Sequence, residues 1–150
     1  MAVVVDTGPL LAAALKRDEA HDLAATLIAF GGRDLLVPDP VVTECEGFLR
    51  QRDAHEAARR LLASLVSGVW VRMPMTPSLF AEAVAIDAHY RDIGLGLVDA
   101  SVMAIAASTH SHVLTFDFRD FRAAPPLGGG SWDLVVDEAQ YAKSVRGRRS

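Results

Sequence analysis

The sequence contains one cysteine, few aromatic residues and no long uninterrupted apolar run. With Cys45 alone, no disulfide can form within the chain, which favours a reducing compartment such as the cytoplasm. No segment reaches the ~18 apolar residues that a membrane-spanning helix needs, so we expect no membrane protein. The apolar run over residues 2–5 has no basic segment before it and ends at Asp6, so we expect no secretory leader.

Basic charge is also scarce. Lys and Arg total 15 against 19 Asp and Glu, giving a net charge of −4 at pH 7. This balance argues against a protein coated in basic surface for duplex DNA. It leaves RNA open, because a few carboxylates gathered in one site would account for the acidic excess. With 51% hydrophobic and 23% charged residues, the composition is typical of one globular domain.

Short apolar runs alternate with helical patterns along the chain. This alternation predicts a single α/β domain with a central parallel sheet of about five strands and helices on both faces. The domain is expected over residues 1–142, and residues 143–150 are expected to form a basic, mobile tail. Strands are expected at 3–5, 35–37, 69–71, 112–115 and 132–136, and helices at 10–15, 20–30, 41–49, 51–67, 78–90 and 98–110.

The first residues end abruptly on an acid. Val3 to Val5 suit a buried strand, Asp6 follows, and Pro9 fits the first turn of a helix. In open α/β sheets, ligands bind at the carboxyl ends of the strands. Asp6 therefore has two interpretations at this point, a ligand-binding carboxylate or a helix N-cap.

Four carboxylates interrupt otherwise apolar patterns, and few basic residues accompany them. They are Asp6, Glu44, Asp99 and Asp117. A buried carboxylate is costly without a partner, and several together repel one another. Mg²⁺ or Mn²⁺ would resolve that repulsion and would assist the hydrolysis of a phosphodiester. Taken singly, Glu44 also suits a solvated helix face, Asp99 an N-cap, and Asp117 a turn.

Neighbouring polar residues are candidates for supporting roles. The hydroxyls of Thr7 and Thr115 could orient a carboxylate or form local turn bonds. Asp120 is a candidate for an auxiliary ligand or a helix cap. Three arginines on expected helices could contact RNA phosphates, or simply solvate their helices: Arg50, Arg59 and Arg60.

In these acidic motifs the sequence resembles the PIN-domain ribonucleases, and among them the VapC-type toxins of bacterial toxin–antitoxin pairs. The opening motif is matched by residues 6–12 (DTGPLLA), and the family's helical glutamate by Glu44. Residues 99–104 (DASVMA) resemble the third motif, and residues 115–121 (TFDFRDF) are close to the fourth. The set appears in the family's order and spans nearly the whole chain.

The resemblance implies a function, a cofactor and partners. Asp6, Glu44, Asp99 and Asp117 would bind one or two Mg²⁺ or Mn²⁺ ions and activate water for RNA hydrolysis, with Asp120 contributing in some members. The family also implies a homodimer and a cognate VapB-like antitoxin that plugs the active site. Operator DNA would be contacted only through that antitoxin. One departure is Gly8, where the family often has a serine.

Two other functions are compatible with parts of the pattern. An aspartate-nucleophile phosphatase also places an Asp after a strand and uses Mg²⁺, but it needs a second Asp where this chain has Gly8. A catalytically silent module that binds antitoxin or RNA would keep the fold without the reaction. The absence of Mg²⁺ or Mn²⁺ binding would favour that second alternative.

Overall fold

The structure, a computed structural model, describes all 150 residues and is built around one parallel sheet. Its order is β3-β2-β1-β4, which places β1 between two neighbours. Val5 at the end of β1 lies opposite Leu114 at the end of β4, so the residues that follow these two strands are adjacent. The strands are β1 (Val3–Val5), β2 (Leu35–Pro38), β3 (Val71–Met73) and β4 (His112–Leu114).

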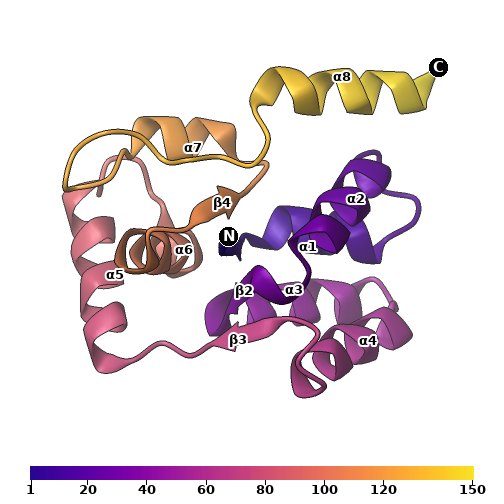
Figure 1. Cartoon of the computed structure of the whole chain (residues 1–150), viewed down its shortest axis with the longest axis horizontal. Coiled ribbons are helices and arrows are strands. Elements are labelled where there is room, and N and C mark those ends of the chain that lie inside the picture. Colours follow the sequence, from indigo (N-terminus) through magenta and orange to yellow (C-terminus); the bar gives the residue numbers. More distant parts are fainter.

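Helices cover both faces of this sheet. Figure 1 shows α5 and α6 on one side of the strands and α1 to α4 on the other, with α7 and α8 along one end. The helices are α1 (Thr7–Ala14), α2 (His21–Gly31), the 3₁₀ turn η1 (Gly32–Asp34), α3 (Asp39–Gln51), α4 (His55–Val66), α5 (Pro77–His89), α6 (Gly96–Thr109), α7 (Phe118–Ala123) and α8 (Glu138–Arg149). None of them combines the length and apolar character needed to cross a membrane.

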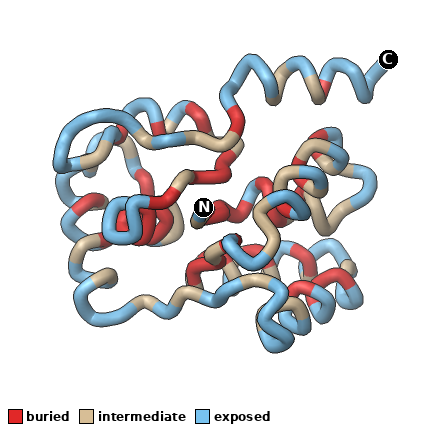
Figure 2. Tube along the Cα trace, viewed as in Figure 1, coloured by how far each residue is buried: buried red, intermediate tan, exposed pale blue.

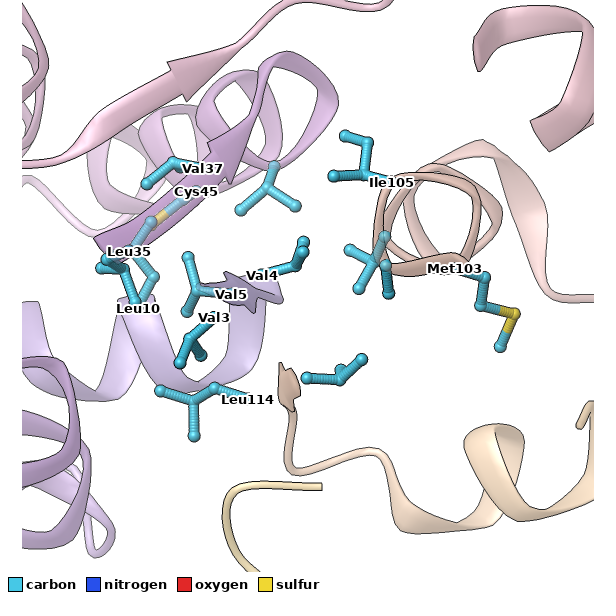
Figure 3. Close-up of a cluster of buried hydrophobic side chains, with 14 of the residues drawn as sticks. Val3, Val4, Val5, Leu10, Leu35, Val37, Cys45, Met103, Ile105 and Leu114 are labelled. Atoms are coloured by element: carbon cyan, nitrogen blue, oxygen red, sulfur yellow. The ribbon is translucent and has the colours of Figure 1, made fainter. Parts of the chain in front are cut away.

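The core is made by the valines of β1 and the helices on either side of them. Val4 and Val5 are fully buried, and Figure 3 shows them between side chains of β2 and α6. In α6 every residue from Ala100 to Ile105 is fully buried. Figure 2 shows buried residues concentrated in the strands and in the parts of the helices that face them. Because α6 is held so tightly, the residue that precedes its buried run, Asp99, is held at the sheet edge as well.

The expected fifth strand is the main correction to the sheet. Residues 132–136 form no strand and contribute only a parallel bridge between Val113 and Leu134. Val113 donates to the Asp133 carbonyl and accepts from the Val135 amide, which is one step of a ladder. Asp137 then caps α8, so the chain leaves the sheet before a second step can form.

Two further expectations on the helices differ from the structure. The helix expected over 51–67 begins only at His55, because the chain turns at residues 52–54 and Asp53 adopts a left-handed conformation with φ of 56°. Residues 143–149, for which we expected a basic, mobile tail, are helical and form the last turns of α8. A periodic apolar pattern could not predict this helix, because Val145 is the only residue of α8 that is buried.

Core packing predicts that the same substitution, Leu→Ala, will change the free energy of unfolding by different amounts at a buried and at an exposed position. Leu49 on α3 is fully buried, whereas Leu127 is 51% exposed. Leu49→Ala should lower the free energy of unfolding by about 2–5 kcal/mol, because it removes buried methyl groups and leaves a cavity. Leu127→Ala should lower it by less than about 1 kcal/mol. Urea titrations followed by circular dichroism measure both, and equal losses would contradict this description of the core.

Candidate metal centre

Asp6 lies at the carboxyl end of the central strand, with both carboxylate oxygens engaged. Its backbone is extended, its amide donates to the Leu114 carbonyl at 2.9 Å, and the residue is 5% exposed. Oδ1 accepts from the Thr7 amide at 2.8 Å, and Oδ2 accepts from the Thr115 hydroxyl at 2.8 Å. Asp6 is therefore the N-cap of α1, and it is also tied to the neighbouring strand.

Thr115 connects Asp6 with the next acid along the chain. Besides donating to Asp6, the Thr115 hydroxyl accepts a hydrogen bond from the Asp117 amide at 3.0 Å. Asp117 in turn caps α7, because its Oδ1 accepts from the Asp120 amide at 3.1 Å. One threonine hydroxyl thus sets the positions of Asp6 and of the Asp117 backbone.

Three carboxylates come together at this edge of the sheet. Asp99, Asp117 and Asp120 each offer an oxygen within 4.8 Å of the others. Asp99 comes from the first turn of α6, and the other two come from the start of α7. The cluster therefore joins two elements that are far apart in the sequence.

Burial and mutual repulsion shift the proton affinities of these acids. Burial, followed by the negative charges of Asp6, Asp117 and Asp120, raises the pKa of Asp99 to about 8. Burial also raises the pKa of Asp6, against the hydrogen bonds from Thr115 and Thr7, and the Asp117 and Glu44 charges add to that rise. Burial raises the pKa of Asp117 too. Burial is the largest cause of each shift, and the charges of neighbouring carboxylates add to each rise.

Glu44 lies beside this group but outside the compact cluster. It is on α3, half-buried, and its charge raises the pKa of Asp6 and of Cys45. It also lines a groove of about 700 Å³ whose other residues include Phe48, Phe80 and Val98. Val98 precedes Asp99 in α6, so one wall of the groove and one acid of the cluster come from the same turn of that helix.

No cation of the chain neutralises these acids. None of the ion pairs in the structure includes Asp6, Glu44, Asp99, Asp117 or Asp120. The neighbouring Arg119 lowers the pKa of Asp117 only as the weakest of the effects on it, and it forms no ion pair. By contrast, Asp39, on the same edge of the sheet, pairs with Arg72 at 3.6 Å.

The donor set fits a hard divalent cation. Carboxylate oxygens are the ligands that Mg²⁺ and Mn²⁺ prefer, and a bound cation would remove the repulsion that raises these pKa values. The Thr7 hydroxyl next to Asp6 is buried and has no hydrogen-bond partner, which is rare for a buried hydroxyl. A polar ligand from outside the chain would satisfy it.

The structure sorts the predicted site residues into groups. Asp99 and Asp117 meet, Asp120 joins them as a full member of the cluster, and Asp6 and Glu44 flank them. The signal for Asp120 was its spacing, since an acid three residues after an N-cap belongs to a helix start.

Of the basic candidates, Arg50 and Arg59 are paired with Glu46 and Glu56 on their own helices, and Arg60 is unpaired.

Gly8 leaves room for the serine that the resemblance led us to expect. A Cβ at Gly8 would meet only the Cβ of Phe116, at 3.9 Å, which is an ordinary contact. The glycine is therefore not required by packing, and a serine would be accommodated at this position of α1.

Comparison with known proteins agrees with this geometry. The family described as PIN domain matches residues 3–125 of this chain. Ribonuclease VapC26 of Mycobacterium tuberculosis is 27% identical over 134 residues, which cover 89% of this chain and 99% of that protein. Among solved structures, VapC20 of M. tuberculosis, a sarcin–ricin loop cleaving toxin, aligns with a TM-score of 0.75 at 24% identity. That alignment covers 85% of this chain and 98% of VapC20.

A second solved structure is also similar in fold. VapBC2 of Rickettsia felis, crystallised with a DNA fragment from its promoter, aligns with a TM-score of 0.64 at 15% identity, covering 85% of this chain and 96% of that one. Both structural alignments show the fold. The family match spans most of the chain and includes every acid of the candidate centre.

The raised pKa of Asp99 predicts how the ion-free protein responds to pH. The folded state retains a proton up to about pH 8, whereas the unfolded state releases it near 3.8. Between those values the unfolded state binds fewer protons, so the contribution of Asp99 to stability falls as the pH rises. Thermal unfolding in EDTA should show Asp99→Asn stabilised over the parent at pH 8 and much less so at pH 5. A variant that is less stable than the parent at pH 8 would contradict the description of Asp99.

Proposed function

This chain belongs to the PIN-domain family, and from that premise we propose that it is a metal-dependent endoribonuclease, the VapC-type toxin of a toxin–antitoxin pair. The observation that carries the proposal is the meeting of Asp99, Asp117 and Asp120 beside Asp6, with no cation to balance them. Such a centre is costly in a protein that does not bind a cation there. The distant similarity to VapC26 supports the ribonuclease reaction.

The cofactor we propose is Mg²⁺ or Mn²⁺, as one or two ions. Asp99, Asp117 and Asp120 would hold it, and Asp6 and Glu44 would complete the set. A divalent ion bound there supplies Lewis-acid stabilisation of phosphoryl charge and makes a water more acidic. These residues fit a phosphodiester hydrolase better than a phosphatase with an aspartate nucleophile, because this chain has Gly8 where such a phosphatase needs its second Asp.

The chain's own groups prepare this site. Thr115 holds the Asp6 carboxylate in one orientation and fixes the Asp117 amide. Because the pKa of Asp99 is raised to about 8, this carboxyl group would have to lose a proton at neutral pH in order to hold a divalent cation. The groove along Glu44 offers the substrate a route to the acids, with Phe48 and Phe80 partly exposed along it.

The proposal extends to substrate, partners and compartment. VapC20 is a toxin that cleaves the sarcin–ricin loop, and for this chain we propose RNA as the substrate class. We also propose a homodimer and a cognate VapB-like antitoxin, through which operator DNA would be reached. The single buried free thiol of Cys45 suits a reducing cytoplasm.

Replacing one clustered carboxylate should abolish RNA cleavage. Asn can cap a helix as Asp does, so Asp117→Asn keeps α7 capped while it removes the charge. The cleavage rate with Mg²⁺ or Mn²⁺ should fall at least about 100-fold, since the group acts on the transition state. Asp92→Asn, at an exposed loop position, is the control and should cleave like the parent. If Asp117→Asn cleaves at the parental rate, this centre is not the active site.

Two glutamates on α3 provide a matched test of cofactor binding. Glu44 is unpaired beside Asp6, whereas Glu46 pairs with Arg50 at 2.7 Å. Calorimetry with Mn²⁺ should give about tenfold weaker binding for Glu44→Gln, because one negative charge near the ion is lost. Glu46→Gln should bind as the parent does. Equal binding by all three proteins would exclude Glu44 from the metal centre, and no binding by the parent would favour a catalytically silent module.

A further inference from the structure

Helix α8 lies beyond the residues that the family match covers, and it begins beside the acidic centre. The match ends at residue 125, whereas α8 begins at Glu138. Its first turn is fixed by a capping box in which the Gln140 amide donates to Asp137 at 2.7 Å and the Asp137 amide donates to the Gln140 side chain at 2.9 Å. Glu138 also pairs with Arg122 on α7. The start of α8 is thus attached to the helix that Asp117 caps.

Tyr141 on α8 packs against the two residues that flank Asp117. Its ring centroid is 4.7 Å from that of Phe116 and 5.7 Å from that of Phe118. Phe118 is buried and Phe116 is half-buried, so the phenylalanines are anchored on one side by the body of the protein and on the other by Tyr141. The peptide units on both sides of Asp117 are therefore held by aromatic contacts.

The far end of α8 is attached to the turn between α1 and α2. Val145 is buried against three alanines, and Figure 1 shows α8 running above α2. The Arg148 side chain donates to the carbonyls of Lys16 and Asp18, and Arg149 pairs with Glu19. The alanines are Ala12, Ala20 and Ala24. These contacts keep Tyr141 in place, although most of the helix surface is exposed (Figure 2).

We propose that Tyr141 is a positioning residue for the metal centre, and that α8 braces the turn that carries Asp117 and Asp120. The inference rests on the proposed function, since the centre it serves is the proposed one. The hydrogen bonds that hold the turn are local: the Asp117 amide donates to Thr115, the Asp120 amide donates to the Asp117 side chain, and the Phe121 amide donates to the Asp117 carbonyl at 3.3 Å. Local hydrogen bonds at a half-buried site open readily unless packing holds the backbone around them.

Amide exchange in the ion-free protein tests this positioning without any metal or substrate. In Tyr141→Ala, the amides of Asp117 and Asp120 should exchange at least about tenfold faster than in the parent, because their acceptors lie in the turn that loses its support. The Asp6 amide, which donates to Leu114 in the sheet, is the internal control and should exchange within about twofold of the parent. Tyr141→Phe keeps the ring and should behave like the parent at all three amides.

Cofactor binding provides the second measurement. By calorimetry, Tyr141→Ala should bind Mn²⁺ at least about fivefold more weakly, and its kcat for RNA cleavage should fall with little change in KM. Tyr141→Phe should restore both. Lys143→Ala, on the exposed side of the same helix, should match the parent in every measurement. If Tyr141→Ala does not fold by circular dichroism, Tyr141→Leu, which keeps an apolar side chain without a ring, replaces it with the same expectations.

The outcomes separate the inference from the proposed function. If the parent binds Mn²⁺ and cleaves RNA while the ring-less variant matches it in exchange, affinity and kcat, then α8 is not a brace and the inference is wrong. If the parent neither binds Mn²⁺ nor cleaves RNA, the proposed function fails, whatever the exchange rates show. Faster exchange confined to Asp117 and Asp120 supports the brace in either case.

Discussion

The hydrogen bond from the Thr115 hydroxyl to Asp6 ties together the ends of two neighbouring strands, and the acidic centre is built outward from it. It exists because β1 and β4 are parallel and in register, with Val5 opposite Leu114. The same hydroxyl accepts from the Asp117 amide, which sets the start of α7 and thereby the position of Asp120. The sheet thus provides a rigid base, which holds the polar groups that follow its strands in fixed positions.

What this base supports is a concentration of negative charge that the chain does not balance. The pKa of Asp99 reaches about 8 because burial and three neighbouring carboxylates act in the same direction. Several acids elsewhere on the molecule are paired, and one of them, Asp39, pairs with Arg72 on the same edge of the sheet. Arg72 shows that a basic side chain can reach this edge of the sheet, yet none pairs with the acids of the centre. This is the arrangement expected where a cation from solution binds.

Residues whose role follows from local pattern could be predicted from the sequence. A β-branched run that ends on Asp6 marks a strand end, and an acid within the apolar segment around Asp99 marks a helix start, so both positions and the family were predicted correctly. The parts that rest on long-range contacts could not be predicted in this way. The segment expected as a fifth strand leaves the sheet after one bridge, and α8 has no repeating apolar face because Val145 is its only buried residue. Only the Asp137 and Gln140 capping box signalled α8 in the sequence, and apolar patterns do not detect it.

The two interpretations of Asp6 and Asp117, as helix caps and as ligands, turn out to be compatible. A carboxylate has about four lone-pair sites, and a cap hydrogen bond occupies one of them. Asp6 uses one site on each oxygen, for Thr7 and Thr115, and Asp117 gives one to the Asp120 amide. Each cap fixes the orientation of its carboxylate before any ligand arrives, so the entropy of ordering the side chain is lost on folding rather than on binding. Capping therefore prepares these acids for a cation, and the helix that each one caps is held in place by the same contact.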